Sequence, residues 1–139
     1  MYCAAERRLY IKANGEIPCW CYNGEDKILF NSDQNTDFVK SVYLGENYAH
    51  MRRSLEKGAA PWPGICQGCP EMKPDVPYLK DRGVKGAIES IQLEFSFLCN
   101  IECVTCIPKK ERKVQKSPPY NMPYDLLKKA MDDIAGAGY

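Results

Sequence analysis

Cysteines are the residues of this sequence best suited to chemistry. Eight of them in 139 residues is a high number, and closely spaced thiols in a reducing compartment are more often metal ligands or redox groups than disulfides. They fall into two groups with a cysteine-free stretch between them, which predicts two metal sites. The first group consists of Cys3, Cys19, Cys21, Cys66 and Cys69, and the second of Cys99, Cys103 and Cys106.

The second group has the spacing C-x3-C-x2-C. Three thiolates do not complete a tetrahedral zinc site, and the only histidine of the chain, His50, is distant in sequence. A cubane iron-sulfur cluster is well served by three cysteines, because each thiolate takes one iron and the fourth iron stays open to an outside ligand. The triad therefore favours a four-iron cluster over zinc.

A strand and a helix are expected on either side of this triad. Apolar and polar residues alternate from Ile91 to Phe97, which is the two-residue period of a strand with one buried face. A helix should begin at about Met122, with Asn121 as its cap, and end at the glycines at 136 and 138. The apolar face of that helix is expected to consist of Leu127, Ala130, Met131 and Ile134.

The first cysteine group is expected on a β-hairpin and beside short helices. The segment 8–13 is β-prone, Asn14-Gly15 is a strong hairpin turn signal, and the segment 16–21 can return as the second strand. Helical spacing of apolar residues over 37–57 predicts two short helices divided at Gly45.

Prolines and glycines indicate a division of the chain into two units. Pro61–Gly64 breaks the chain just before the C-x2-C pair, and the segment 74–86 is punctuated by both residue types. We therefore expect a first unit at 1–72, a linker at 73–88 and a second unit at 89–139.

The composition is that of an ordinary globular protein and names no partner. Hydrophobic residues make up 45% of the chain and charged residues 27%, with a formal net charge of +1. So balanced a charge gives no overall attraction to nucleic acid or to an anionic membrane. No signal peptide and no apolar run of membrane-spanning length is found in the sequence, so a cytoplasmic protein without a membrane partner is expected.

The triad, with a strand before it and a helix after it, resembles the signature of radical S-adenosylmethionine (SAM) enzymes. The resemblance implies that Cys99, Cys103 and Cys106 hold a 4Fe-4S cluster whose open iron is chelated by SAM. It further implies that a reduced electron donor such as flavodoxin or ferredoxin supplies the electron that cleaves SAM to a 5′-deoxyadenosyl radical. Residues 89–139 would then be the first strand, cluster loop and helix of the family's partial (β/α) barrel.

The first cysteine group resembles the SPASM or twitch modules that accompany many radical SAM enzymes. The resemblance implies a second, auxiliary 4Fe-4S cluster bound by Cys3, Cys66 and Cys69, with either Cys19 or Cys21 as the fourth ligand. The expected fold class is therefore α+β: a small cysteine-rich module of a β-hairpin and helices, followed by the first unit of the barrel. Substrates implied for such proteins are of the peptide, protein or sugar type.

Three function classes remain open. A complete (β/α) barrel takes about 250 residues, so we expect this chain to be a fragment, a truncated product or a chain completed by a second subunit, and not to turn over substrate alone. The alternatives to an enzyme are a non-catalytic iron-sulfur module for electron transfer and a zinc-stabilised interaction domain, in which the first cysteine group supplies four thiolates.

Three further side chains have expected roles near these sites. His50 is expected to be a surface residue of a helix rather than a metal ligand. Trp20 and Trp62 are expected to pack around the auxiliary cluster and to shield it from water.

Overall fold

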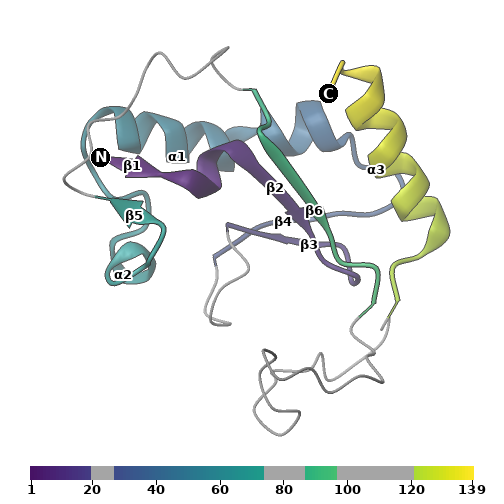
Figure 1. Ribbon diagram of the computed structural model, residues 1–139, viewed down its shortest axis with the longest axis horizontal. Helices are drawn as coiled ribbons and strands as arrows, with labels where there is room; N and C mark the ends of the chain where they lie inside the picture. Colours follow the sequence, from purple (N-terminus) through teal and green to yellow (C-terminus); the bar gives the residue numbers. More distant parts are fainter. Residues whose placement is uncertain (20–26, 74–86, 97–120) are drawn as a thin grey trace, which may run out of the picture.

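The structure is a mixed arrangement of small sheets and short helices, which confirms the α+β class (Figure 1). This computed structural model describes residues 1–19, 27–73, 87–96 and 121–139. In chain order the elements are β1 (Tyr2–Cys3), the 3-10 helix η1 (Ala4–Arg7), β2 (Arg8–Ile11), β3 (Glu16–Pro18), β4 (Ile28–Asn31), the π-helix η2 (Phe38–Tyr43), α1 (Glu46–Glu56), α2 (Pro63–Cys66), β5 (Met72–Lys73), β6 (Ser90–Leu93) and α3 (Tyr124–Gly136).

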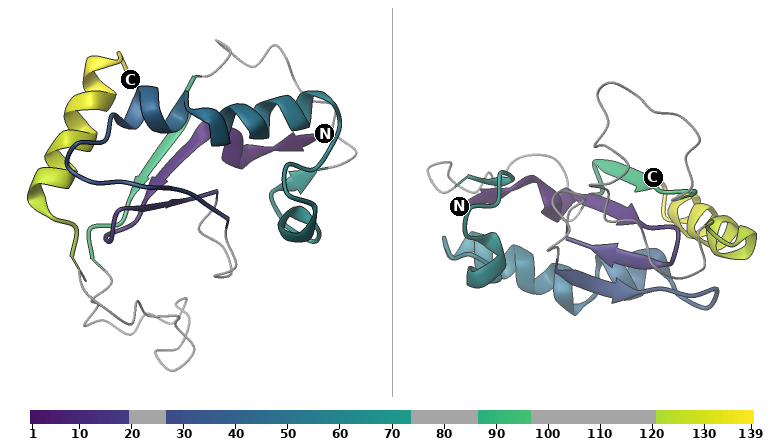
Figure 2. Two further views of the ribbon diagram at one scale, coloured as in Figure 1. Left: turned by 180° about the vertical axis from the view of Figure 1, so that it is seen from behind. Right: turned by 90° about the horizontal axis from the view of Figure 1, so that it is seen from below.

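Strands β6, β2, β3 and β4 lie side by side in that order, as the right-hand view of Figure 2 shows. β6 is parallel to β2, with Leu9 opposite Ile91 and Ile11 opposite Leu93. β4 is antiparallel to β3. At the other end of the molecule, β1 and β5 form a separate antiparallel pair.

The turn predicted at Asn14-Gly15 is confirmed, but the predicted hairpin ladder is wrong. Gly15 has a φ of +84°, a left-handed conformation that glycine adopts without strain. The amide of Lys12 donates to the carbonyl of Glu16 over 2.9 Å, which closes the turn. The ladders of the two strands run outward instead, from β2 to β6 and from β3 to β4. A two-stranded hairpin is marginally stable in water, and a neighbour on each side supplies the missing hydrogen bonds.

Helices η2 and α1 cover one face of these strands and form the core with them (Figure 2). The sequence prediction of two short helices divided at Gly45 is confirmed, because η2 ends at Tyr43 and Gly45 is the N-cap of α1. The side chains with less than 2% exposure at this interface include Leu9, Ile11 and Ile17 from the strands and Phe38, Tyr43, Tyr48, Met51 and Leu55 from the helices.

Polar contacts hold β6 in register against the first half of the chain. The hydroxyl of Tyr43 donates to the carbonyl of Ala87 over 2.9 Å and to that of Glu6 over 3.1 Å. The amide of Glu89 donates to the carbonyl of Arg7 over 2.8 Å. These bonds align the start of β6 with the start of β2.

Helix α3 packs on the same core, and the predicted apolar face is confirmed in part. Ala130 and Ile134 are buried as predicted and Leu127 is partly buried against the core, whereas Met131 is 52% exposed and Leu126 is buried instead. The cap is also different, since Pro123 occupies the N-cap position and makes no side-chain cap bond. Asn121, the predicted cap, instead forms an isolated bridge with Ser96.

The two units expected from the sequence share this core. One hydrophobic cluster contains residues from both units. It joins residues of 1–72 to Met122, Leu126, Ala130 and Ile134. The carboxylate of Asp133 on α3 also accepts a hydrogen bond from the amide of Phe38 over 2.9 Å. The division at 73–88 stays a prediction, because most of that segment lies outside the described residues.

The strand expected before the cysteine triad is present as β6, but its apolar side chains are not buried as predicted. Ile91 is 36% and Phe95 is 59% exposed, and Leu93 alone of the three packs against the core. β6 is the outermost strand of the four (Figure 2), and a strand at an edge keeps part of its surface in water. Phe97 lies outside the described residues.

None of the described helices has the length and apolar character needed to cross a membrane.

The close approach of Gly45 to η2 gives a direct test of this packing. A Cβ atom at position 45 would lie 2.1 Å from the carbonyl oxygen of Ser41, so we expect Gly45→Ala to lower the free energy of unfolding by more than about 2 kcal/mol. Gly136→Ala is the matched control, because its Cβ would meet no described atom within 4 Å, and a change within about 1 kcal/mol is expected. Urea denaturation measures both, and equal values for the two variants would contradict the packing.

Candidate metal centre

Four cysteines from three distant segments of the sequence line one pocket. Cys3 belongs to β1, Cys19 follows β3, Cys66 ends α2 and Cys69 lies in the turn after it. The pocket has about 360 Å³ of empty volume, part of it open to solvent. All four residues are present as thiols rather than disulfides. The sequence predicted one site from Cys3, Cys66, Cys69 and either Cys19 or Cys21. Of these two alternatives, the structure describes Cys19 only.

Local backbone geometry brings the C-x2-C pair to the pocket. Pro63 occupies the first turn of α2, where its missing N–H costs no hydrogen bond. The amide of Cys66 donates to the carbonyl of Trp62 over 2.7 Å, and the amide of Cys69 to that of Cys66 over 3.2 Å. Gly68 between them has a φ of +78°, which lets the chain turn back within three residues.

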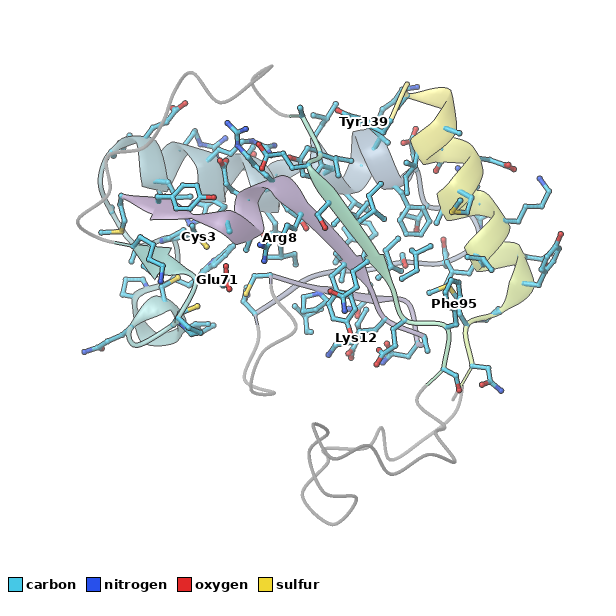
Figure 3. The ribbon with its side chains drawn as sticks, in the orientation of Figure 1. Cys3, Arg8, Lys12, Glu71, Phe95 and Tyr139 are labelled. Atoms are coloured by element: carbon cyan, nitrogen blue, oxygen red, sulfur yellow. The ribbon has the colours of Figure 1, made fainter. Side chains whose placement is uncertain are left out.

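Strand pairing brings the other two cysteines to the same place. Cys3 is the register partner of Met72 in the β1–β5 pair, so β1 lies directly against the end of the C-x2-C segment. The amide of Cys19 donates to the carbonyl of Lys27 over 2.8 Å, which extends the β3–β4 pairing to the edge of the pocket. Figure 3 shows Cys3 and Glu71 close together at this end of the molecule.

The wall of the pocket is mostly apolar, and Trp62 is part of it as the sequence predicted. Met51, Pro61 and Met72 also line it. The ring of His50 lies 5.6 Å from that of Trp62, and its Nε2 atom is 3.0 Å from the carbonyl oxygen of Pro61. His50 is therefore a half-buried helix residue that supports the wall, rather than the surface residue that was expected. Trp20 lies outside the described residues.

Burial sets the protonation state of the thiols. The pKa of Cys3 is raised to about 12: burial is the largest cause, the nearby Cys69, Cys66 and Cys19 add to the rise, and a backbone hydrogen bond at Ala5 opposes it. Burial also raises the pKa of Cys66. At neutral pH and without a bound cation these side chains are protonated and weakly nucleophilic. A metal that binds here must therefore displace protons, and its affinity will rise with pH.

The four cysteines share the pocket, but as the structure describes them they do not form a site for a single metal ion. Among the described residues, no group of three Cys, His, Asp or Glu side chains is arranged so that it could hold one metal ion. The arrangement differs from a mononuclear zinc site, in which each sulfur lies about 2.3 Å from the same ion.

One charged residue of the wall was not found from the sequence. Glu71 lines the pocket, and its carboxylate lies 3.6 Å from the guanidinium of Arg8. Nothing in the residue pattern links these two positions, because the contact depends on the folding of β5 beside β1. The carboxylate of Glu71 beside the thiols is therefore paired with the guanidinium of Arg8.

The remaining predicted ligands cannot be placed relative to this pocket. Cys21, Cys99, Cys103 and Cys106 lie outside the described residues. Their roles stay predictions. Along the chain, the structure describes the strand β6 before the triad and the helix α3 after it.

Comparison with family models, with curated proteins and with solved structures gives no match for this chain.

The protonation of Cys3 can be tested by alkylation of the metal-free protein. At pH 8 we expect iodoacetamide to modify Cys3 at least roughly tenfold more slowly in the native chain than in urea, because burial raises the pKa of the native thiol. Mass spectrometry of the peptide that contains Cys3 measures both rates. Since the native pKa lies above the ordinary value of a cysteine thiol, the stabilisation from the neutral thiol should also be lost as the pH rises from 9 toward 12. Equal alkylation rates in the two states would contradict this picture.

Proposed function

We propose that Cys3, Cys19, Cys66 and Cys69 hold a 4Fe-4S cluster, and that the chain is an iron-sulfur protein of the radical SAM type in which this cluster is the auxiliary centre. The observation that carries the proposal is the shared pocket of four thiols from three separate segments of the chain. Thiolates are the usual protein ligands of such clusters, and four of them satisfy all four irons. Such a fully ligated centre would serve electron transfer or structure rather than substrate binding.

The arrangement of the four thiols favours a cluster over zinc. A single zinc ion requires its four sulfurs to converge on one point, and the described thiols are not arranged in that way. A cubane places each thiolate on a different iron and so holds its ligands farther apart.

The apolar wall supports the same choice. Met51, Trp62 and Met72 limit the access of water to the thiols. Solvent exposure is one of the quantities that set the reduction potential of an iron-sulfur cluster. A structural zinc site, which has no redox chemistry, gains nothing from this shielding.

Cys19 is the fourth ligand in this proposal. The sequence left Cys19 and Cys21 as alternatives, and the structure describes Cys19 at the pocket. Its backbone is fixed there by the hydrogen bond to Lys27. Cys21 is then free for another role.

The radical SAM part of the proposal depends on the order of elements around the cysteine triad. β6 is parallel to β2 and ends a few residues before Cys99, and α3 follows the triad. Reactive loops of α/β proteins lie at the carboxyl ends of parallel strands, so this order supports a second cluster at Cys99, Cys103 and Cys106. When bound, this cluster and SAM would supply one-electron chemistry for modification of a peptide, protein or sugar-type substrate.

Anaerobic reconstitution with iron and sulfide tests the assignment. The wild-type chain should bind roughly eight irons, four in each of two clusters, and should show the brown colour of iron-sulfur proteins. Cys19→Ser should lower the iron content, because the auxiliary cluster loses a ligand. Cys21→Ser, the matched control, should leave the iron content unchanged. Replacing Cys99, Cys103 and Cys106 together should halve the iron.

Three results would count against the proposal. A colourless protein that binds zinc would support the interaction domain instead. Iron content that is lost in Cys21→Ser but kept in Cys19→Ser would reverse the ligand assignment. If both clusters form but the reduced protein does not cleave SAM, with any partner chain present, the chain would be a non-catalytic electron-transfer module.

A further inference from the structure

The two cysteines of the C-x2-C pair occupy the first and last positions of one β-turn. Gln67 has a φ of −68° and a ψ of 119°, and Gly68 has a φ of +78°. The amide of Cys69 donates to the carbonyl of Cys66 over 3.2 Å, which closes the turn. These angles and this hydrogen bond define a type II turn, whose third position glycine occupies without strain.

The turn holds the two Cα atoms at a separation that suits a disulfide. The ends of a β-turn lie less than about 7 Å apart, and the Cα atoms of bonded cysteines are usually about 4.4–6.8 Å apart. A bond between Cys66 and Cys69 therefore fits the turn as it stands. Their proximity is also felt electrostatically, since Cys69 contributes to the raised pKa of Cys66, although burial is its largest cause.

The pair is a part of the pocket that a dissolved reagent can reach. All other residues of 63–70 are exposed, and Cys66 and Cys69 are partly exposed. Cys3, by contrast, has only 7% of its surface exposed. A soluble oxidant therefore reaches the C-x2-C pair more readily than it reaches Cys3.

We propose that Cys66 and Cys69 form a reversible disulfide in the metal-free protein, and that this bond closes the pocket to metal. The second half of this inference rests on the proposed function, because the same two thiols are ligands of the proposed cluster. A disulfide has no thiolate to offer, so oxidation of the pair removes two of the four ligands. Metal binding and oxidation of the pair then oppose each other.

The oxidant is a small disulfide such as glutathione disulfide. The thiolate of one cysteine attacks a glutathione sulfur, which forms a mixed disulfide and releases one glutathione thiolate. The thiolate of the other cysteine then attacks the protein sulfur of the mixed disulfide, and the second glutathione leaves. The cysteine pair loses two electrons and glutathione disulfide gains them, and the two cysteine protons end on the two glutathione molecules.

Equilibration of the metal-free wild type with glutathione mixtures tests the disulfide. Trypsin releases residues 58–80 as a peptide that contains Cys66 and Cys69 and no other cysteine. After alkylation of free thiols, mass spectrometry distinguishes the peptide with two alkyl groups from the peptide with an internal disulfide. We expect the disulfide to form with an equilibrium constant at least about tenfold larger in the native chain than in urea, because the native turn already holds the two cysteines together.

A glycine variant connects the disulfide to the turn. Alanine is strained at a φ of +78°, so Gly68→Ala should lower the native equilibrium constant at least about threefold. Gly64→Ala is the matched control and should behave as the wild type does. An added Cβ meets no described atom within 4 Å at either position, and of the two glycines only Gly68 has a positive φ.

The iron-loaded wild type tests the competition with metal. In the same glutathione mixture, the loaded chain should contain at least about tenfold less of the disulfide, and removal of the iron with a chelator should restore it. If the chain takes up no iron, the cluster proposal fails, and the comparison of the native and denatured chains decides on the disulfide alone.

The proposal is overturned by any of three results. The first is a peptide that keeps two alkyl groups in excess glutathione disulfide. The second is an equal equilibrium constant in the native chain and in urea. The third is an iron-loaded chain in which the pair is oxidised while the iron stays bound.

Discussion

The candidate site depends on one constraint: the fold brings four cysteines to one pocket, where Cys3 is buried and Cys19, Cys66 and Cys69 are partly buried. Cys3 is held by the pairing of β1 with β5, and the C-x2-C pair by the turn at Gly68. Burial keeps the pKa of Cys3 far above neutrality, so that without a cation Cys3 is a neutral thiol beside an apolar wall. Only a positively charged metal group makes the thiolate form favourable there. The core formed by α1 and the strands provides the support for this wall, because Met51 belongs to both.

The sequence predicted the local features of the fold and missed those that depend on contacts between distant segments. The turn at Gly15 and the division of the helices at Gly45 follow from the conformational properties of glycine, which act over a few residues. The partner of β2 could not be predicted, since it is a parallel strand eighty residues later in the chain. The buried face of α3 was misjudged at one position for the same reason: Leu126 and Met131 are both apolar, and the packing of α3 against η2 decides which of them is covered.

The candidate site shows the same limit. Cysteine spacing was enough to group Cys3, Cys66 and Cys69, but not to distinguish Cys19 from Cys21, because both lie at the end of the same strand signal. Glu71 was missed because its place at the pocket arises from strand pairing and not from a residue pattern. Figure 3 shows that Lys12 and Phe95 lie at the opposite end of the β2–β6 pair from Cys3. The Arg8–Glu71 ion pair joins the start of β2 to the thiol pocket, since Glu71 lines that pocket.

The most direct measurement of the central claim is native mass spectrometry of the anaerobically loaded chain in which Cys99, Cys103 and Cys106 are all replaced by serine. The account predicts a single added mass equal to four irons and four sulfides, held by the four cysteines that remain at the pocket. A mass increase equal to one zinc ion, or no increase after loading with iron and sulfide, would contradict it.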